Sequence, residues 1–384
     1  MVAALVGLLT EPAGGIDCHF AGVLGGLVEQ RVSSRGGQSM ERRRAGVLWL
    51  VVLCLGVVCG TLLGAGCGSG STPRTVPVQS TAPVPVRQSV PLIVNHASAG
   101  WSCLVVDVSV GGGRSVPVIV DTGSAGLLLN ANAIGPNAQV SGRSFSSGFV
   151  GAPTFTVTVV SAQVNIGGPA GVTTPQPVAI GSVASKAPML GFSDCGGAQG
   201  VLGVGVGNPG PAVPPLESPL VQLAPSLSDG YTITLTGNTG TLLVGKPAIS
   251  PTSVSLPLPE ENGTYPNGHQ AYQRDVTLCW TVGTARGCGL TNIDSGFSFP
   301  AIRPDFLPAL PHQGPLIAAG TSVSITTPTG AALQSFITAS APPEVRLALA
   351  RLFGSTEANT GIGFFFANSV GFDVSSGHVV ITPK

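Results

Sequence analysis

The sequence predicts an all-β protein made of two lobes, and two observations carry that prediction. The chain of 384 residues contains 55 Gly and 33 Pro, and it is 43% hydrophobic but only 9% charged. Such a composition disfavours long helices and suits many short strands joined by turns. In addition, Val118–Ser124 has a counterpart at Asn292–Phe297, where an apolar run again leads to an aspartate, a hydroxyl residue and a glycine. A repeated unit of this kind indicates two related halves.

Local patterns support the same fold class. Alternating or β-branched residues predict strands over Thr154–Val164, Tyr231–Leu235 and Ser322–Thr326. Helical spacing occurs over Val213–Leu227 and Pro342–Phe353, and prolines bound both segments. We therefore expect short strands throughout, with helix confined to these two segments.

The two repeated aspartates, Asp121 and Asp294, are 294 − 121 = 173 residues apart. Either tripeptide alone is a common turn sequence that only caps a strand. As a facing pair about 3 Å apart, two charged carboxylates would repel by roughly 5 kcal/mol at an effective dielectric near 20. One carboxyl would then stay protonated while its partner ionises. Such a pair can deprotonate a water and protonate a carbonyl oxygen, which is the chemistry of peptide hydrolysis.

The residues after each aspartate suit this chemistry. Gly123 and Gly296 allow the backbone to approach the carboxylates closely, where a Cβ would collide. Thr122 and Ser295 carry hydroxyls that can bond across to the opposite lobe and fix the two carboxylates. We therefore expect a site at which the two halves of the chain meet.

These motifs and several further segments resemble the pepsin-like aspartic protease family over about residues 97–384. The further segments occur in the family's order: Ala99–Gly113 with Ser115–Leu129, Gly200–Gly205, Thr241–Gly245, and Gly361–Phe366 running on to Val370–Asp373 and His378–Pro383. Within that family the sequence is similar to the actinobacterial branch, which includes mycobacterial PE-family surface proteases. Some uncharacterised bacterial lipoproteins share part of the pattern.

The resemblance implies a bilobal fold with a cleft between two β-barrel-like lobes, at 91–245 and 246–384. It implies catalysis by Asp121 and Asp294 on a protein or peptide substrate, with no cofactor and no metal. It also implies that Gly361–Phe366 belongs to the final strands, with Ile362-Gly363 as the second hydrophobic-Gly element beside the active site.

One departure from the family lies directly after the second motif. Phe297 stands where the family usually has a serine or threonine that bonds the outer carboxylate oxygen, whereas Ser124 keeps that hydroxyl in the first motif. We therefore expect an asymmetric pair in which Asp294 is less supported in its ionised form and holds the proton more readily.

A second departure lies in the flap, the hairpin that in this family carries a tyrosine over the substrate. Here the candidate is Arg143–Pro153 with Phe145 and Phe149, and the chain has no tyrosine between the first motif and Tyr231. Phe149 can cover a substrate but cannot donate a hydrogen bond. The two departures keep open a rival function, that of a non-catalytic surface lipoprotein which binds peptides or envelope components with the same fold.

Four cysteines follow the N-terminal region, and four cysteines allow three pairings. Cys279 and Cys288 flank Trp280–Gly287, which is a predicted hairpin, so we expect them to pair locally. Cys103 and Cys195 would then pair within the first lobe. A zinc site is the alternative, but the spacing does not match paired Cys-x2-Cys knuckles.

The N-terminal region indicates export. A basic cluster, the uncharged run Ala45–Gly66 and Cys67 follow one another within residues 40–67, as in a bacterial lipoprotein signal peptide with Cys67 as the lipidated residue. An uncleaved signal anchor is the alternative, because the uncharged run is just long enough to span a bilayer. Residues 1–39 read as an over-extended start or a disordered segment, and 68–90 as a Pro/Ser/Thr-rich tether.

Location and partners follow from these features. We expect a monomer held at the outer face of the bacterial plasma membrane by an N-terminal lipid or signal anchor. The formal net charge of zero argues against a nucleic-acid partner.

Overall fold

The computed structural model describes residues 86–97, 101–149, 154–184, 195–207, 216–265, 267–307, 310–352 and 354–384. All of them belong to one compact unit. The predicted signal peptide, Cys67 and most of the predicted tether lie outside the described residues. The first strand begins at Gln88, so the last three residues assigned to the tether (68–90) belong to a strand instead. No helix among the described residues is long and apolar enough to cross a membrane.

A large sheet spans both halves of the described chain. Its order is β13-β26-β25-β11-β12-β1-β2-β3-β10-β4-β9-β6-β5, and β7 and β8 extend it from β2. The strands are β1 (Gln88–Ala97), β2 (Trp101–Val110), β3 (Val116–Asp121), β4 (Ala125–Asn130), β5 (Gln139–Ser147), β6 (Phe155–Ala162), β7 (Val164–Ile166), β8 (Val172–Thr173), β9 (Val178–Val183), β10 (Gly200–Val204), β11 (Gly230–Thr236), β12 (Thr239–Val244), β13 (Val254–Pro257), β25 (Asn368–Asp373) and β26 (His378–Pro383). Because β25 pairs with β11, this sheet crosses the lobe boundary expected near residue 246.

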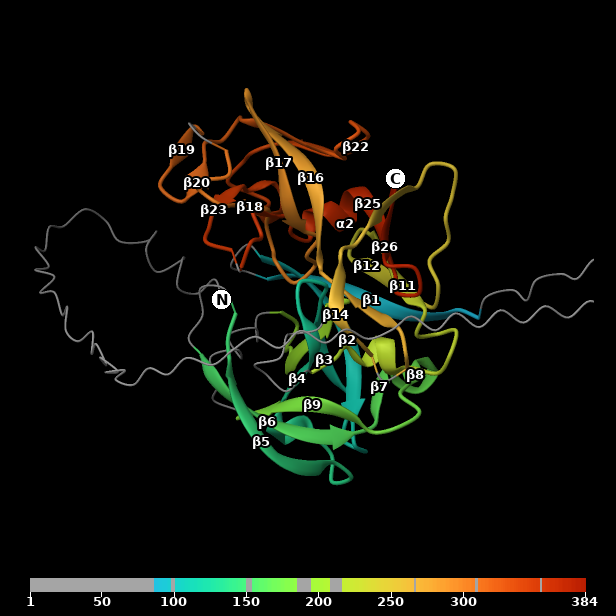
Figure 1. Ribbon diagram of the computed structural model, residues 1–384. Coiled ribbons are helices and arrows are strands. Elements are labelled where there is room, and N and C mark those ends of the chain that lie inside the picture. The colour runs from blue at the N-terminus through green and yellow to red at the C-terminus, as the bar shows by residue number, and fades with distance from the viewer. Residues whose placement is uncertain are drawn as a thin grey trace, which may run out of the picture. The chain divides into compact units, whose positions relative to one another are not determined.

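A second sheet belongs to the C-terminal half, in the order β19-β20-β23-β18-β24-β17-β16-β21-β22. Its strands are β16 (Asp275–Val282), β17 (Ala285–Asn292), β18 (Ala301–Ile302), β19 (His312–Gln313), β20 (Leu316–Ile317), β21 (Ser322–Thr326), β22 (Ala332–Ile337), β23 (Ala348–Leu349) and β24 (Ala358–Asn359). A separate hairpin is formed by β14 (Glu260–Thr264) and β15 (Gln270–Tyr272). Figure 1 shows the orange and red strands of the second sheet on one side of β1, β11 and β12, and the green β5, β6 and β9 on the other.

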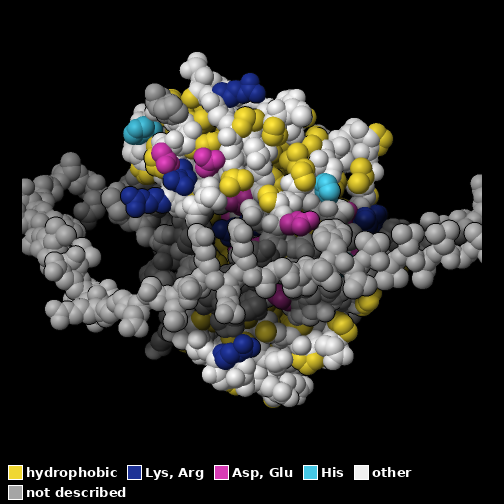
Figure 2. Space-filling view, viewed as in Figure 1, with side chains coloured by type: hydrophobic (Ala, Val, Ile, Leu, Met, Phe, Trp, Pro, Cys, Tyr) yellow, Lys and Arg dark blue, Asp and Glu magenta, His cyan; other side chains and the backbone are white. Residues whose placement is uncertain are grey.

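The core follows from strand alternation. In β3, Val116, Val118 and Val120 are fully buried in the main hydrophobic core, whereas Ile119 faces a smaller cluster on the other side of the strand. Such alternation is the side-chain period of a strand. On the face that Figure 2 shows, the few charged side chains are scattered among hydrophobic and polar ones.

The predicted strands are confirmed, since Thr154–Val164, Tyr231–Leu235 and Ser322–Thr326 correspond to β6 with β7, β11 and β21. The helix predictions are wrong. The described part of Val213–Leu227 contains only the 3-10 turn η4 (Pro219–Gln222), and Pro342–Phe353 contains η5 (Pro343–Val345) followed by β23. Prolines at the start of both turns are compatible with a first helical turn but remove backbone donors, and β23 instead pairs with its neighbours β18 and β20.

Helix occurs instead at α2 (Gly363–Ala367), where the resemblance implied a strand. Phe364 and Phe365 in this segment are fully buried. A short, wholly apolar run has no periodicity that separates a buried helix from a buried strand, which explains the error. Two further 3-10 turns are η1 (Ala131–Ala133) and η2 (Gly168–Ala170).

Both expected disulfides are present. Cys279 and Cys288 lie directly opposite each other in the β16–β17 hairpin, with Cα atoms 3.9 Å apart. Cys103 in β2 pairs with Cys195, with a Cα–Cα distance of 6.0 Å. The zinc alternative is thereby removed for these four residues.

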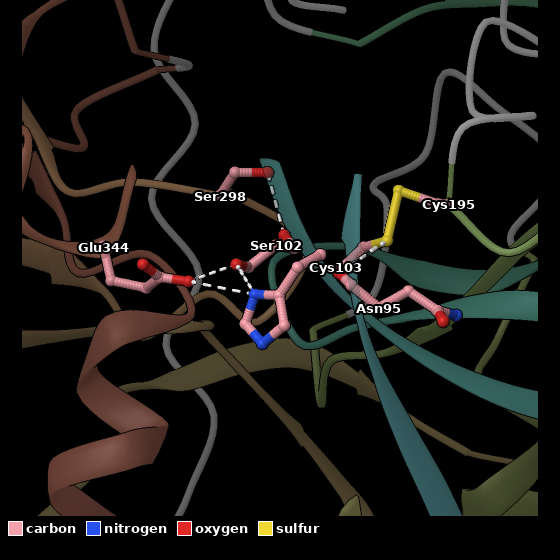
Figure 3. Close-up of a disulfide and its surroundings, with 7 residues drawn as sticks. Asn95, Ser102, Cys103, Cys195, Ser298 and Glu344 are labelled. Carbon is pink, nitrogen blue, oxygen red and sulfur yellow. Dashed lines mark hydrogen bonds and ion pairs between the residues drawn. A yellow bond between two sulfur atoms is a disulfide. The ribbon is translucent and has the colours of Figure 1, made fainter. Parts of the chain in front are cut away.

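Contacts between the two halves of the chain also form beside the Cys103–Cys195 disulfide (Figure 3). The buried Ser102 hydroxyl in β2 donates to the carboxylate of Glu344 in η5, and the Nδ1 atom of His96 lies 2.8 Å from the same hydroxyl oxygen. The Ser298 hydroxyl donates to the Ser102 main-chain oxygen over 2.9 Å. These bonds connect β1 and β2 to segments that follow the second aspartate motif.

Candidate active site

Equivalent strands carry the two aspartates. β3 ends at Asp121 and pairs in parallel with β10, so that Gly203 lies opposite Asp121. In the other half, β17 ends two residues before Asp294 and pairs in parallel with β24, with Asn292 opposite Asn359. Asp121 and Asp294 are only 8% and 9% exposed. Each aspartate therefore lies at or just after the end of a strand and is almost wholly buried.

The hydroxyl residues that follow the aspartates join the two halves. The Thr122 hydroxyl donates to the Ile293 carbonyl over 2.6 Å and accepts from the Ser295 backbone N–H over 2.9 Å. Reciprocally, the Ser295 hydroxyl donates to the Val120 carbonyl over 2.8 Å and accepts from the Thr122 N–H over 3.2 Å. These four bonds fix the two aspartate loops against each other, as the sequence predicted for Thr122 and Ser295.

The glycines bring each loop against the opposite aspartate. A Cβ added at Gly123 would lie 2.5 Å from the carboxyl carbon of Asp294, and one at Gly296 would lie 2.5 Å from that of Asp121. Either distance is too short for a real Cβ. The Gly123 N–H donates to Asp121 Oδ1, and the Gly296 N–H to Asp294 Oδ1, both over 2.8 Å. Each aspartate loop therefore lies against the opposite carboxyl, close enough for the charge of Asp121 to act on Asp294, and we call the two carboxyls the dyad.

The second carboxylate oxygens have different donors in the two halves. Ser124 donates its hydroxyl to Asp121 Oδ2 over 2.5 Å. Phe297 packs edge-on against Phe299, with ring centroids 5.2 Å apart. Asp294 Oδ2 instead accepts from the side-chain amide of Asn359 over 2.7 Å. Asn359 thus supplies to Asp294 a side-chain donor that Phe297 cannot provide.

Sequence reasoning missed Asn359 because it searched for a hydrophobic-Gly element and placed it at Ile362-Gly363. The strand beside the aspartate loop is β24, and Asn359 occupies it with its Oδ1 atom accepting from the Gly361 N–H over 2.9 Å. That bond leaves the amide nitrogen to face Asp294. The signal available in the sequence was the polar pair Asn359-Thr360 between Ala358 and Gly361, directly before the apolar run Ile362–Phe366.

The pKa of Asp294 is raised by its surroundings. Burial, followed by the charge of Asp121, raises the pKa of Asp294 from 3.8 to about 8, and the hydrogen bond between the carboxyls acts in the same direction. The hydrogen bonds from Asn359 and Gly296 lower this pKa but do not cancel the rise. Asp294 is thus the carboxyl that holds a proton at neutral pH, which was the direction expected.

The predicted flap residues lie on the hairpin of β5 and β6. Phe145 is in β5, and Phe149 lies 5.9 Å from Phe155 between ring centroids. Both rings pack against a cluster within the first half of the chain, formed by Leu128, Phe155, Val157, Val159, Val183 and Leu216. Phe149 also packs against a second cluster, which contains Ile119 and the Cys103–Cys195 disulfide. Ile119 lies in β3, two residues before Asp121.

Within the described part of the chain, no group of three or more His, Cys, Asp or Glu side chains could hold a metal ion.

Comparisons with known proteins bear on the family and on the fold. Residues 88–379 match the family model of the PE-PGRS C-terminal aspartyl peptidase-like domain. Among solved structures, the crystal structure of aspartic proteinase from Irpex lacteus is similar, with a TM-score of 0.54 over 78% of this chain and 98% of that chain. The two sequences are 17% identical, so this likeness shows the bilobal, mostly β fold alone. No curated protein sequence matches this chain.

Proposed function

Because this chain belongs to the family of PE-PGRS C-terminal aspartyl peptidase-like domains, we propose that it is an aspartic endopeptidase with Asp121 and Asp294 as its catalytic residues. The observation that carries the proposal is the facing pair of carboxyls. Each carboxyl lies against the glycine of the opposite loop, the four bonds of Thr122 and Ser295 hold the two loops together, and burial with the charge of Asp121 raises the pKa of Asp294.

The proposed reaction uses the two protonation states of the dyad. Asp121, held by the Gly123 N–H and the Ser124 hydroxyl, takes a proton from a water as the water oxygen attacks the peptide carbonyl. Asp294 donates its proton to the carbonyl oxygen, which gives a tetrahedral gem-diol. Asp121 then passes the proton it took from water to the leaving nitrogen, Asp294 takes a proton back from a gem-diol hydroxyl, and the C–N bond breaks to give the acid and the amine. Buried donors around both carboxylates need no reorganisation during this step.

Substrates of this enzyme are proteins or peptides, covered in the cleft by the hairpin that carries Phe145 and Phe149. We further propose that it works outside the cytoplasm as a monomer at the outer face of the plasma membrane, anchored through lipid on Cys67. The two disulfides support the compartment, because disulfides persist in oxidising environments.

The test of catalysis is cleavage of a mixed peptide library by the purified protein, read by mass spectrometry. We expect cleavage by the wild-type protein and none by Asp121→Ala or Asp294→Ala, with unchanged far-UV circular dichroism in both variants. Peptides that bind without being cut by the wild-type protein would instead establish the rival function, a peptide-binding surface lipoprotein.

Lipid anchoring has its own test. Metabolic labelling with a fatty-acid analogue should mark the wild-type protein and not Cys67→Ala. Equal labelling of the two proteins would exclude Cys67 as the lipidated residue.

A further inference from the structure

An arginine lies beside the dyad and takes no part in the proposed mechanism. Arg274, in the link between β15 and β16, donates from Nη1 to the main-chain oxygen of Gly123 over 2.5 Å. Gly123 touches both carboxyls, since its N–H bonds Asp121 and its Cα faces Asp294. Among the described residues, no other Lys or Arg side chain bonds to the loop of residues 121–124.

Arg274 is held in place from its own half of the chain. Its Nε atom lies 3.8 Å from Asp275 Oδ1. Asp275 is buried, and its carboxylate also accepts from the Asn292 amide and the Thr356 hydroxyl. The Tyr272 N–H, two residues earlier, donates to the segment after β10. The backbone around Arg274 is therefore held in place, and its ion-pair partner Asp275 also accepts from two other donors.

The outer part of the guanidinium remains available. The Arg274 side chain is 35% exposed, and it makes no other hydrogen bond or ion pair within the described ranges. A guanidinium has five N–H donors arranged in a planar fork, which matches the two oxygens of a carboxylate. Arg274 thus presents unused donors and a positive charge next to the reacting carboxyls.

The charge of the dyad makes this position significant for substrate choice. A dyad with one shared proton carries one negative charge, which repels any acidic side chain bound close to the scissile peptide bond. A cation tied to the same loop offsets that repulsion and supplies donors to the acidic group. Resting on the proposed function, we propose that Arg274 is a specificity-determining residue that selects peptides with an acidic side chain near the scissile bond.

A purely structural role is the competing explanation, because the bond from Arg274 to Gly123 also connects the two halves. Loss of a structural bond would lower activity on all peptides alike, whereas loss of a specificity residue would change the ratio between acidic and neutral peptides. The experiment therefore measures that ratio.

The test uses short quenched peptides with one Glu moved through the positions around the cleavage site, each paired with the Gln version, at about pH 6, where the Glu is ionised. For at least one position we expect the wild-type kcat/KM to favour Glu by about tenfold. The ratio should fall to about one in Arg274→Gln and be partly kept in Arg274→Lys. Arg87→Gln is the matched control, since Arg87 also donates to a main-chain oxygen, that of Lys246, in an exposed place, and should keep the wild-type ratio.

Binding of the same pairs to Asp294→Asn, with and without Arg274→Gln, separates this proposal from the proposed function. A preference for Glu in binding that disappears with Arg274→Gln supports the role of Arg274 even if no peptide is cut. Equal binding and equal cleavage of Glu and Gln peptides at every position would overturn it, as would an equal loss for both members of a pair in Arg274→Gln.

Discussion

Replacement of Asp294 by Asn should change how the stability of the protein depends on pH. The folded dyad holds one proton throughout the window between the ordinary aspartate pKa of 3.8 and the raised value of about 8. In the unfolded chain both carboxyls are ionised above about pH 5 and hold none. The unfolded state therefore binds one proton fewer, and the free energy of unfolding falls by about 1.4 kcal/mol per pH unit as the pH rises.

The sign follows from the raised pKa. The stability that a protonated Asp294 contributes is fully present below pH 3.8 and is lost as the pH rises towards about 8. Between about pH 5.5 and pH 7 the wild-type protein should lose about 2 kcal/mol of stability from this proton alone. Asp294→Asn removes this titrating group, so the free energy of unfolding of the variant should fall by about 2 kcal/mol less than that of the wild type between about pH 5.5 and pH 7. Its absolute stability also includes a pH-independent cost, because an asparagine cannot accept from both Gly296 and Asn359.

The assay is urea denaturation of both proteins at several pH values within this window, followed by circular dichroism. Asp305→Asn serves as the control, because Asp305 is exposed, pairs with Arg303 and has a lowered pKa, so its removal leaves the slope in this window unchanged. Identical slopes in wild type and Asp294→Asn would refute the assignment of the shared proton to this site.

Three further outcomes follow from the same contacts. Thr122→Val removes a hydroxyl that makes two cross-lobe bonds and leaves the Ser295 N–H unpaired, so urea denaturation should show a loss of about 2–4 kcal/mol, and an unchanged midpoint would contradict this. Asn359→Ala removes a donor that lowers the pKa of Asp294, so the alkaline limb of the pH–rate profile should move to higher pH; a shift to lower pH would contradict the assigned role. Replacing both Cys279 and Cys288 by Ser opens a loop with a sequence separation of only 9, so thermal denaturation should show a modest loss of about 2–3 kcal/mol, with no loss counting against the chain-entropy argument.

The aspartate loops could be predicted from the sequence because their geometry depends on short-range chemistry. A β-branched run buries one face of a strand, and the glycine after the hydroxyl residue leaves room for the opposite carboxyl. Gly123 and Gly296 meet the requirement in the same way. Residues within a few positions of each other therefore indicate both the strand and the approach of the second lobe.

Asn359 and Arg274 could not be predicted in this way. Asn359 reaches Asp294 because β17 and β24 pair in parallel, and Arg274 reaches Gly123 across 151 residues of sequence. Both contacts depend on tertiary placement, which a single sequence does not encode in any local pattern. In addition, β24 contains the polar Asn359, whereas the corresponding strand in the first half, β10, is wholly apolar.

The misplaced helices have a related cause. Within Pro342–Phe353 the helical geometry ends after the single turn η5, and Ala348–Leu349 then form β23 between β18 and β20 in the second sheet. The run Gly363–Ala367 is short and wholly apolar, so its pattern carries no period, and Phe364 and Phe365 within it are fully buried. In both places tertiary partners decide the local structure.

The pH dependence of kcat/KM for peptide cleavage tests the central claim most directly, because only a singly protonated dyad is active. The account predicts a bell-shaped profile whose alkaline limb falls near the raised pKa of Asp294, about 8, and no turnover by Asp121→Asn or Asp294→Asn at any pH. Cleavage that persists in both variants, or a rate that keeps rising through the alkaline range, would contradict catalysis by a shared proton between Asp121 and Asp294.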